Sequence, residues 1–111
     1  SDIVSCGPAF FSFLLQKFID AATLETAIDR ERAEKLAAEM MIGFGELLKS
    51  QLYTLSSLEK KVNVKGGITG EGLKVLEKSP IEETFRQLFK ATHGKFQEDV
   101  GMVSRQFERD Y

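Results

Sequence analysis

The first long apolar segment, residues 10–22, predicts a helix that is buried on nearly every side. Its apolar residues cover most of the helical circumference instead of forming one stripe. Pro8 suits a first helical turn, and Ser5 or Cys6 stands at the N-cap position. We expect the helix to begin near Gly7 or Pro8. Polar residues interrupt the segment well short of the ~20 apolar residues that a bilayer requires, so a buried helix is the better interpretation.

A second helix is predicted between residues 33 and 48, where apolar residues recur every three or four positions on a single face. Asp29 precedes this segment and can cap the helix, because its carboxylate accepts free N–H groups of the first turn. Gly43 and Gly45 lie inside it at a propensity cost of about 1 kcal/mol each relative to alanine. We therefore expect another segment to pack closely against that turn.

The middle of the chain predicts two shorter helices joined by a glycine-rich loop. Ser56 and Glu59 have the spacing of a capping box, which predicts a short helix with a buried side formed by Leu55, Leu58 and Val62. The following loop, residues 65–72, contains paired glycines that break the helix. Thr69 can cap the next helix, which runs through Leu73, Val75 and Leu76.

The last helix is predicted to begin at Pro80, with Ser79 as its N-cap and Glu82 at the third position. Its apolar stripe continues to Phe107, and about 28 residues at 1.5 Å each span ~42 Å. A compact domain of this size has a radius of gyration of only ~13 Å, so the helix should project beyond its own core. We expect a second chain to cover it. The fold predicted for residues 1–111 is therefore one all-α domain of about five helices without a sheet.

Composition limits the cellular compartment and the classes of binding partner that we expect. The chain has 111 residues, 15 basic and 17 acidic side chains and a net charge of −2, without a basic block that would attract nucleic acid. Cys6 is the single cysteine and cannot form an internal disulfide, and no secretory signal pattern is present. We expect a cytoplasmic protein without a membrane or nucleic-acid partner.

Few residues suggest chemistry by themselves. The glycine-rich loop lacks GxGxxG spacing and follows a helical pattern, so it does not predict dinucleotide binding. Its free N–H groups at a helix N-terminus, beside the Thr69 hydroxyl, suit a small carboxylate, although a plain capped turn explains the pattern equally well. His93 has no neighbours with metal-ligand spacing, and Cys6 has no histidine near it in sequence to act as a base. The acidic pairs 82–83 and 98–99 indicate a solvated helix face.

Three segments resemble the C-terminal domain of pyrroline-5-carboxylate reductases. That domain opens with Gly-Ser-Gly-Pro-Ala-Tyr, which the segment Cys6-Gly7-Pro8-Ala9-Phe10 resembles. Residues 34–38, followed by Gly43 and residues 47–48, are similar to the family's second helix. Residues 62–69 look like its Val-x-Ser-Pro-Gly-Gly-x-Thr loop. The three matches occur in order between residues 5 and 107.

The resemblance implies a function for the parent enzyme, the reduction of the ring imine of pyrroline-5-carboxylate to proline with NADPH or NADH. An N-terminal Rossmann domain, absent from this chain, would hold most of the cofactor, so the isolated domain is expected to be inactive. By position, Thr69 would be catalytic and hydrogen-bond the imine nitrogen, while Gly66, Gly67 and Thr69 would bind the substrate carboxylate. Cys6 and Gly7 would lie near the nicotinamide. The family also implies a homodimer with interwoven helices, alone or within a higher oligomer, and no metal.

The loop departs from the family at several positions. The usual Ser-Pro before the glycines is Val64-Lys65 here, and the common Leu-Lys-Asp upstream reads Leu58-Glu59-Lys60. Such a loop is expected of a divergent paralogue, for example the reductase-like protein associated with late competence genes in some bacteria. Two further hypotheses therefore stay open beside the reductase. One is a reductase-like regulatory dimer that has lost turnover, favoured by Val64, Lys65 and Ile68, and the other is an unrelated helical interaction module.

Overall fold

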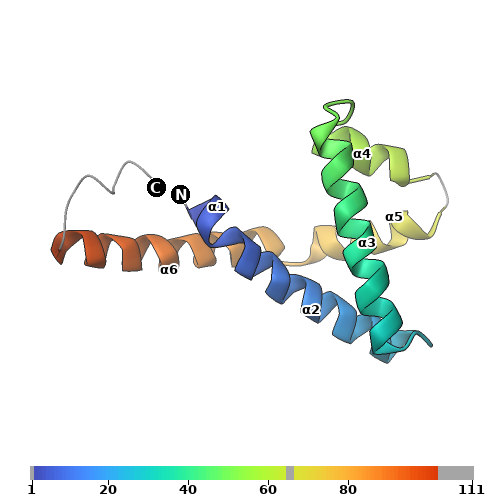
Figure 1. Ribbon diagram of the computed structural model, residues 1–111, viewed down its shortest axis with the longest axis horizontal. Helices are drawn as coiled ribbons and strands as arrows, with labels where there is room; N and C mark the ends of the chain where they lie inside the picture. Colours follow the sequence, from blue (N-terminus) through green and yellow to red (C-terminus); the bar gives the residue numbers. More distant parts are fainter. Residues whose placement is uncertain (1, 65–66, 103–111) are drawn as a thin grey trace. The chain divides into compact units, whose positions relative to one another are not determined.

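The computed structural model describes residues 2–64 and 67–102 of the chain, and side chains between residues 3 and 95 except at 65–66. These residues form helices and no strand, which confirms the all-α prediction (Figure 1). In chain order the helices are α1 (Asp2–Ser5), α2 (Gly7–Glu25), α3 (Arg30–Lys49), α4 (Leu55–Val62), α5 (Ile68–Lys78) and α6 (Ile81–Met102). One of them, the single turn α1, was not among the predicted elements.

The chain divides into two units, which we describe separately. One contains Ala9–Gly67, and thus most of α2 together with α3 and α4. The other combines the described residues of Ser1–Pro8 and of Ile68–Tyr111, and thus α1, α5 and α6.

In the first unit, α2 and α3 meet at a short turn, where the core lies. Helix α2 begins at Gly7 as predicted, and α3 is capped by Asp29, whose Oδ1 accepts a hydrogen bond from the Arg32 N–H at 2.8 Å. Both predicted starts are confirmed. The core cluster consists of Ile19, Ala33 and Ala37, flanked by Leu15 and Ile28. An ion pair also joins Arg30 to Asp20 across the turn.

The charges around Arg30 contribute little to the stability of this turn. Arg30 also lies 3.4 Å from Glu34, one helical turn away. Its pKa is raised above the ordinary value, chiefly by the hydrogen bond with Asp20. All three side chains are exposed to solvent, so water and salt screen their attraction. Hydrophobic contacts must therefore hold α2 against α3.

The buried surface of this unit is small for the apolar residues it carries. Phe13 and Phe18 of α2 remain 58% and 63% exposed, although the sequence predicts a helix covered on nearly every side. No described residue has a fully buried large side chain. A chain of this size struggles to cover such a helix by itself, and the exposed phenylalanines agree with the expectation that a second chain does so.

Two details of α3 and α4 differ from the sequence prediction. Apart from the helix's own backbone, nothing in the described chain lies within 4 Å of a Cβ built on Gly43 or Gly45. The prediction that another segment packs there is therefore wrong for the described residues of the same unit. Helix α4 forms, but its capping box joins Thr54 and Ser57 instead of Ser56 and Glu59, with Ser57 N–H donating to Thr54 Oγ1 at 3.0 Å. Of its predicted buried side only Leu58 is buried, whereas Leu55 and Val62 are exposed.

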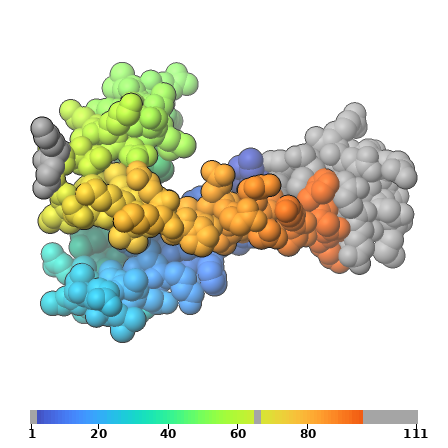
Figure 2. Space-filling view, turned by 180° about the vertical axis from the view of Figure 1, so that it is seen from behind, coloured from blue at the N-terminus to red at the C-terminus, as the bar shows by residue number. Residues whose placement is uncertain are grey.

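In the second unit, α6 follows α5 across Ser79–Pro80 (Figure 2). Helix α6 begins at Ile81, one residue after the predicted start, because the Pro80 carbonyl accepts the first helical hydrogen bond from Thr84. Ser79 does not act as the predicted N-cap of α6, because its hydroxyl donates instead to the Leu76 carbonyl of α5 at 2.6 Å. The 22 described residues of α6 extend ~33 Å. The predicted continuation to Phe107 lies outside the described residues.

The predicted faces of α6 are present where side chains are described. Ile81 and Phe89 of the apolar stripe are 42% and 38% exposed, whereas Phe85 and Leu88 are half-buried. Glu82 and Glu83 are exposed, which confirms the solvated face for this acidic pair. The side chains of the other acidic pair, residues 98–99, lie outside the described part. None of the described helices has the length and apolar content to cross a membrane.

Candidate functional site

The candidate substrate loop connects α4 to α5. Helix α4 ends where the Asn63 N–H donates to the Glu59 carbonyl at 2.9 Å. The chain then turns tightly, because the Gly67 N–H donates to the carbonyl of Val64, also at 2.9 Å. Lys65 and Gly66, the latter predicted to bind substrate, lie outside the described residues. The described part of the loop is thus a hydrogen-bonded turn that leads directly into α5.

Gly67 is the described position of this loop where a side chain has little room. A Cβ at residue 67 would lie 3.0 Å from the carbonyl oxygen of Val64, and 3.7 Å from the Val64 Cβ. The first contact is shorter than ordinary van der Waals separation, and it involves the same backbone oxygen that accepts the Gly67 N–H. A side chain at residue 67 would therefore push against the bond that closes the turn.

Thr69 lies in the first turn of α5, where its side chain is exposed. The helix begins at Ile68, so Thr69 lies inside the helix and the prediction that it is the N-cap is wrong. The hydroxyl is therefore not committed to capping, and it forms no hydrogen bond with a residue of the described ranges. It remains available beside the N–H groups of the first turn, which have no partner within the helix and favour an anion.

An ion pair in α5 alters the charge of this helix end. Glu71 stands in the first turn, and its Oε1 lies 3.4 Å from the ammonium group of Lys74. The carboxylate already interacts favourably with the positive end of the helix and would repel an anionic ligand. Lys74 offsets part of that charge. The i, i+3 spacing of Glu71 and Lys74 is the signal in the sequence that predicts such a pair.

The predicted cofactor residues lie at the start of α2. Cys6 occupies the turn between α1 and α2 and is partly buried, and its Sγ lies 3.7 Å from the Ser5 hydroxyl oxygen. Gly7 is the first residue of α2, and a Cβ built on it would meet nothing within 4 Å in the described chain. A flat ring can therefore approach the backbone here. Residues 3–16 around this helix start carry no charged side chain that could hold a pyrophosphate.

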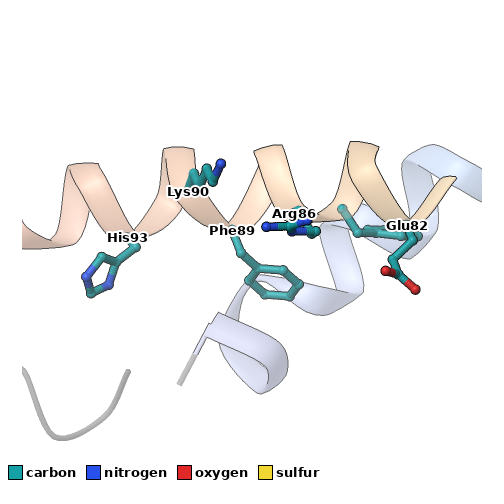
Figure 3. Close-up of a pocket in the computed structure, with 6 residues that line it drawn as sticks. Glu82, Arg86, Phe89, Lys90 and His93 are labelled. Atoms are coloured by element: carbon teal, nitrogen blue, oxygen red, sulfur yellow. The ribbon is translucent and has the colours of Figure 1, made fainter. Parts of the chain in front are cut away.

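A shallow groove of about 560 Å³ runs along α6 and offers no equivalent chemistry. Figure 3 shows Phe89 and His93 on the same side of the helix, with Glu82, Arg86 and Lys90 around them. Arg86 is paired with Glu83 at 3.5 Å. Within the described part of the chain, no group of histidine, cysteine or acidic side chains is arranged to hold a metal ion. His93 is therefore part of a mixed helix surface.

Comparison with known proteins places the chain in a family. A family model described as pyrroline-5-carboxylate reductase dimerisation matches residues 1–99. ComE operon protein 4 of Bacillus subtilis (strain 168) is 52% identical over 107 residues, which cover 96% of this chain and 39% of that protein. Pyrroline-5-carboxylate reductase 3 of the same organism is 26% identical over 106 residues, with the same coverage of 96% and 39%. No solved structure matches the chain.

A more distant relative points the same way. The pyrroline-5-carboxylate reductase of Methanobrevibacter smithii is 34% identical over 76 residues, which cover 68% of this chain and 30% of that enzyme. The chain thus spans about two fifths of the length of its Bacillus subtilis relatives, or 39% in each case. These matches confirm the resemblance inferred from the three segments, and the all-helical architecture agrees with them. Since the family model covers residues 1–99, the chain belongs to the pyrroline-5-carboxylate reductase dimerisation family.

Proposed function

We propose that the chain is the dimerisation and substrate domain of a cytoplasmic NAD(P)H-dependent reductase that converts pyrroline-5-carboxylate, or a related cyclic imine, to proline. The observation that carries the proposal is the turn at Gly67 leading into α5, with the exposed hydroxyl of Thr69 in its first helical turn. Membership of the family supports a homodimer. The nucleotide-binding domain would lie outside these residues, so the chain alone is expected to be inactive.

The geometry of α5 suits the two polar ends of such a substrate. Its carboxylate would accept hydrogen bonds from the N–H groups around Gly66, Gly67 and Thr69, where the helix dipole also favours negative charge. The Thr69 hydroxyl would hydrogen-bond the ring nitrogen. Reduction adds a hydride to the imine carbon and a proton to the nitrogen, so a polar group held at the nitrogen stabilises the charge that develops there. Positioning and electrostatics are the domain's contribution.

The start of α2 fits the edge of a nicotinamide site. NAD(P)H would supply the hydride. Gly7 leaves its backbone open to a flat ring, and the partly buried Cys6 lies directly before it. These residues would flank the ring, while the phosphate and ribose contacts would come from another domain. This division agrees with the sequence of residues 3–16, which carries no charged side chain.

A regulatory dimer without turnover is a second candidate function. It is favoured by the 52% identity to ComE operon protein 4, whose name gives an operon and no reaction. Val64 and Ile68 lie on either side of Gly67 in the loop. In the family's loop, a serine followed by proline stands at the position of Val64, and a variable residue stands at the position of Ile68. Val64 presents an exposed apolar side chain there. Both candidates use the same dimer and differ only in whether the loop still binds an imine.

Thr69→Val in the full-length protein tests the proposed chemistry. Valine keeps the side-chain volume but removes the hydroxyl. Loss of a hydrogen bond costs about 0.5–1.5 kcal/mol, and more where charge develops in the transition state. We therefore expect kcat/KM for pyrroline-5-carboxylate to fall about tenfold or more, since each 1.4 kcal/mol is a factor of ten. NAD(P)H affinity should stay unchanged, because its binding groups lie mainly elsewhere.

The matched control is Thr84→Val in the first turn of α6. Thr84 donates its hydroxyl to the Pro80 carbonyl at 3.0 Å, so its replacement perturbs a helix start without touching the proposed site. We expect kcat/KM to remain within about twofold of the parent for this variant. A folded Thr69→Val protein that turns over as fast as the parent would refute the role of Thr69. A parent without turnover on either cofactor would favour the regulatory dimer.

A further inference from the structure

One side of α5, next to the Thr69 hydroxyl, is apolar. Helical geometry at about 100° per residue places four residues on this side, within about 100° of one another around the axis. They are Ile68, Thr69, Gly72 and Leu76, and we call them the α5 face. The spacing of four from residue 68 to 72 and from 72 to 76 sets these three one helical turn apart. Thr69 thus provides a hydroxyl at the edge of an otherwise apolar surface.

The α5 face is exposed in the described chain. Ile68 is 92% exposed and Leu76 is 51% exposed, and Thr69 and Gly72 are exposed as well. Leu73, on another side of the same helix, is half-buried instead. An isoleucine side chain that stays in water contributes little to the stability of its own unit, because the hydrophobic gain comes from burial. Ile68 is therefore free to contact a bound molecule.

Gly72 leaves room in the middle of the α5 face. A Cβ built on Gly72 would meet nothing within 4 Å, apart from its neighbours in the helix. No side chain therefore stands between Ile68 and Leu76 on this side of the helix. Glycine inside a helix costs stability relative to alanine, and it allows another group to approach the backbone closely. The space beside Gly72 can take a few carbon atoms between two larger apolar side chains.

The proposed substrate geometry brings the ring towards this space. With the carboxylate held at the first N–H groups of α5 and the ring nitrogen at the Thr69 hydroxyl, two ring carbons remain that are not bonded to nitrogen. These carbons lie on the side of the ring away from the helix start. Gly72 follows Thr69 by three residues, which is nearly one turn along the same side. A group attached to either carbon would therefore reach Gly72 and Ile68.

We propose that the α5 face makes the site selective for cyclic imine carboxylates that carry a small alkyl group on one of these two ring carbons. The inference rests on the proposed function, because it uses Thr69 to place the ring. Ile68 is the specificity-determining side chain, and Gly72 provides the room. An unsubstituted ring leaves Ile68 exposed, whereas each added carbon that the face removes from water should raise kcat/KM about fourfold.

The charges of α5 favour an apolar group over a charged one. The charged residues nearest the face are Glu71 and Lys74, which lie about 100° and 160° around the helix from Gly72. They are paired with each other at 3.4 Å. The pair partly neutralises itself and lies outside the α5 face. A charged substituent would lose hydration at Gly72 without gaining a partner there, which is unfavourable.

The test compares substrates in the full-length protein with NADPH and with NADH. The kcat/KM is measured for pyrroline-5-carboxylate and for its derivatives with a methyl or an ethyl group on such a ring carbon. We expect the ethyl derivative to exceed the unsubstituted substrate about tenfold in the parent. Gly72→Ala should reduce this ratio to about one, because the alanine methyl group fills the space. Ile68→Ala should reduce it about threefold or more, because the apolar contact is shortened.

Gly94→Ala is the matched control. Gly94 lies inside α6, and a Cβ built on it also meets nothing within 4 Å in the described chain. The same substitution therefore raises helix propensity at both glycines, but only Gly72 belongs to the α5 face. Gly94→Ala should leave the ratio of the two kcat/KM values within about twofold of the parent. Because the readout is a ratio of two substrates on one protein, a change in the amount of folded enzyme cancels.

A binding measurement keeps the inference separate from turnover. Titration calorimetry with the oxidised cofactor present compares proline with the proline that carries the same ethyl group. We expect the ethyl compound to bind about tenfold more tightly to the parent, and Gly72→Ala to remove the difference. A parent that shows this preference but reduces no imine would refute the proposed reduction and support the α5 face. A parent that reduces pyrroline-5-carboxylate without any preference would do the reverse.

Three other results would overturn the inference. One is a parent that favours the unsubstituted ring in both turnover and binding. Another is an equal change of the ratio in Gly72→Ala and Gly94→Ala, which would show that the space at Gly72 has no special role. The third is a Gly72→Ala protein that keeps the parent's ratio while its dimer dissociates more readily in sedimentation equilibrium. In that case a second copy of the chain, and not the substrate, covers the α5 face.

Discussion

Replacing Gly67 with alanine tests whether the turn before α5 is as tight as its geometry indicates. The added Cβ would lie 3.0 Å from the Val64 carbonyl oxygen, which also accepts the Gly67 N–H at 2.9 Å. The contacted atom belongs to the backbone, so it cannot rotate away as the end of a side chain would. Relief of the contact requires the turn to open and its hydrogen bond to lengthen.

The expected change in stability is the balance of two effects. Weakening the hydrogen bond costs up to about 0.5–1.5 kcal/mol. Replacement of glycine also restricts the unfolded chain, which stabilises the protein by about 0.4–1 kcal/mol where the backbone accepts alanine. We therefore expect Gly67→Ala to range from neutral to about 1 kcal/mol less stable than the parent.

Gly72→Ala is the matched control for this prediction. Gly72 lies inside α5, and a Cβ there would meet nothing within 4 Å of the described chain. Alanine should therefore stabilise the helix by about 0.5–1 kcal/mol. The two variants should differ by about 0.5–2 kcal/mol, or by about 2 °C or more in Tm. Thermal unfolding is compared at one protein concentration, because association contributes to the stability of a dimer. Equal Tm values for the two variants would refute the reasoning.

Two further predictions concern the ends of α3. Asp29→Ala removes the carboxylate that accepts the Arg32 N–H at 2.8 Å, and it should cost about 1 kcal/mol in urea unfolding, whereas Asp29→Asn should retain most of the stability. An alanine variant as stable as the parent would contradict the capping role. Gln51 follows the helix with a φ of 63°, so Gln51→Gly should stabilise the protein by up to about 1 kcal/mol, while Lys49→Gly within the helix should destabilise it. A loss of stability in Gln51→Gly would count against strain at that residue.

The sequence predicts helices well where local signals agree. Asp29 is followed by an apolar stripe, and Pro8 opens a long apolar segment, so both starts are found at the predicted positions. At α4 the hydroxyls of Thr54, Ser56 and Ser57 compete for the same cap. Local spacing alone could not decide between them. The observed start at Leu55 leaves Leu58 buried, which is a property of the packed unit.

The parts of the site that the sequence could not determine depend on contacts beyond local spacing. The start of α5 at Ile68 follows from the turn between Val64 and Gly67. No capping pattern in the sequence predicts this turn. Gly43 indicated a close helix contact, but the sequence did not tell which chain would provide it. The roles of Thr69 and Cys6 came from family resemblance, and they remain predictions because no contact among the described residues tests them.

The small core between α2 and α3 affects how the protein is made in the cell. Two of its three buried residues are alanines, each of which removes only a methyl group from water. A newly synthesised chain therefore gains little stability before it meets another, while side chains such as Phe18 stay exposed to proteases and to other unfolded proteins. Survival of the chain then depends on its own concentration. We expect its abundance to fall more steeply than its rate of synthesis when expression is reduced.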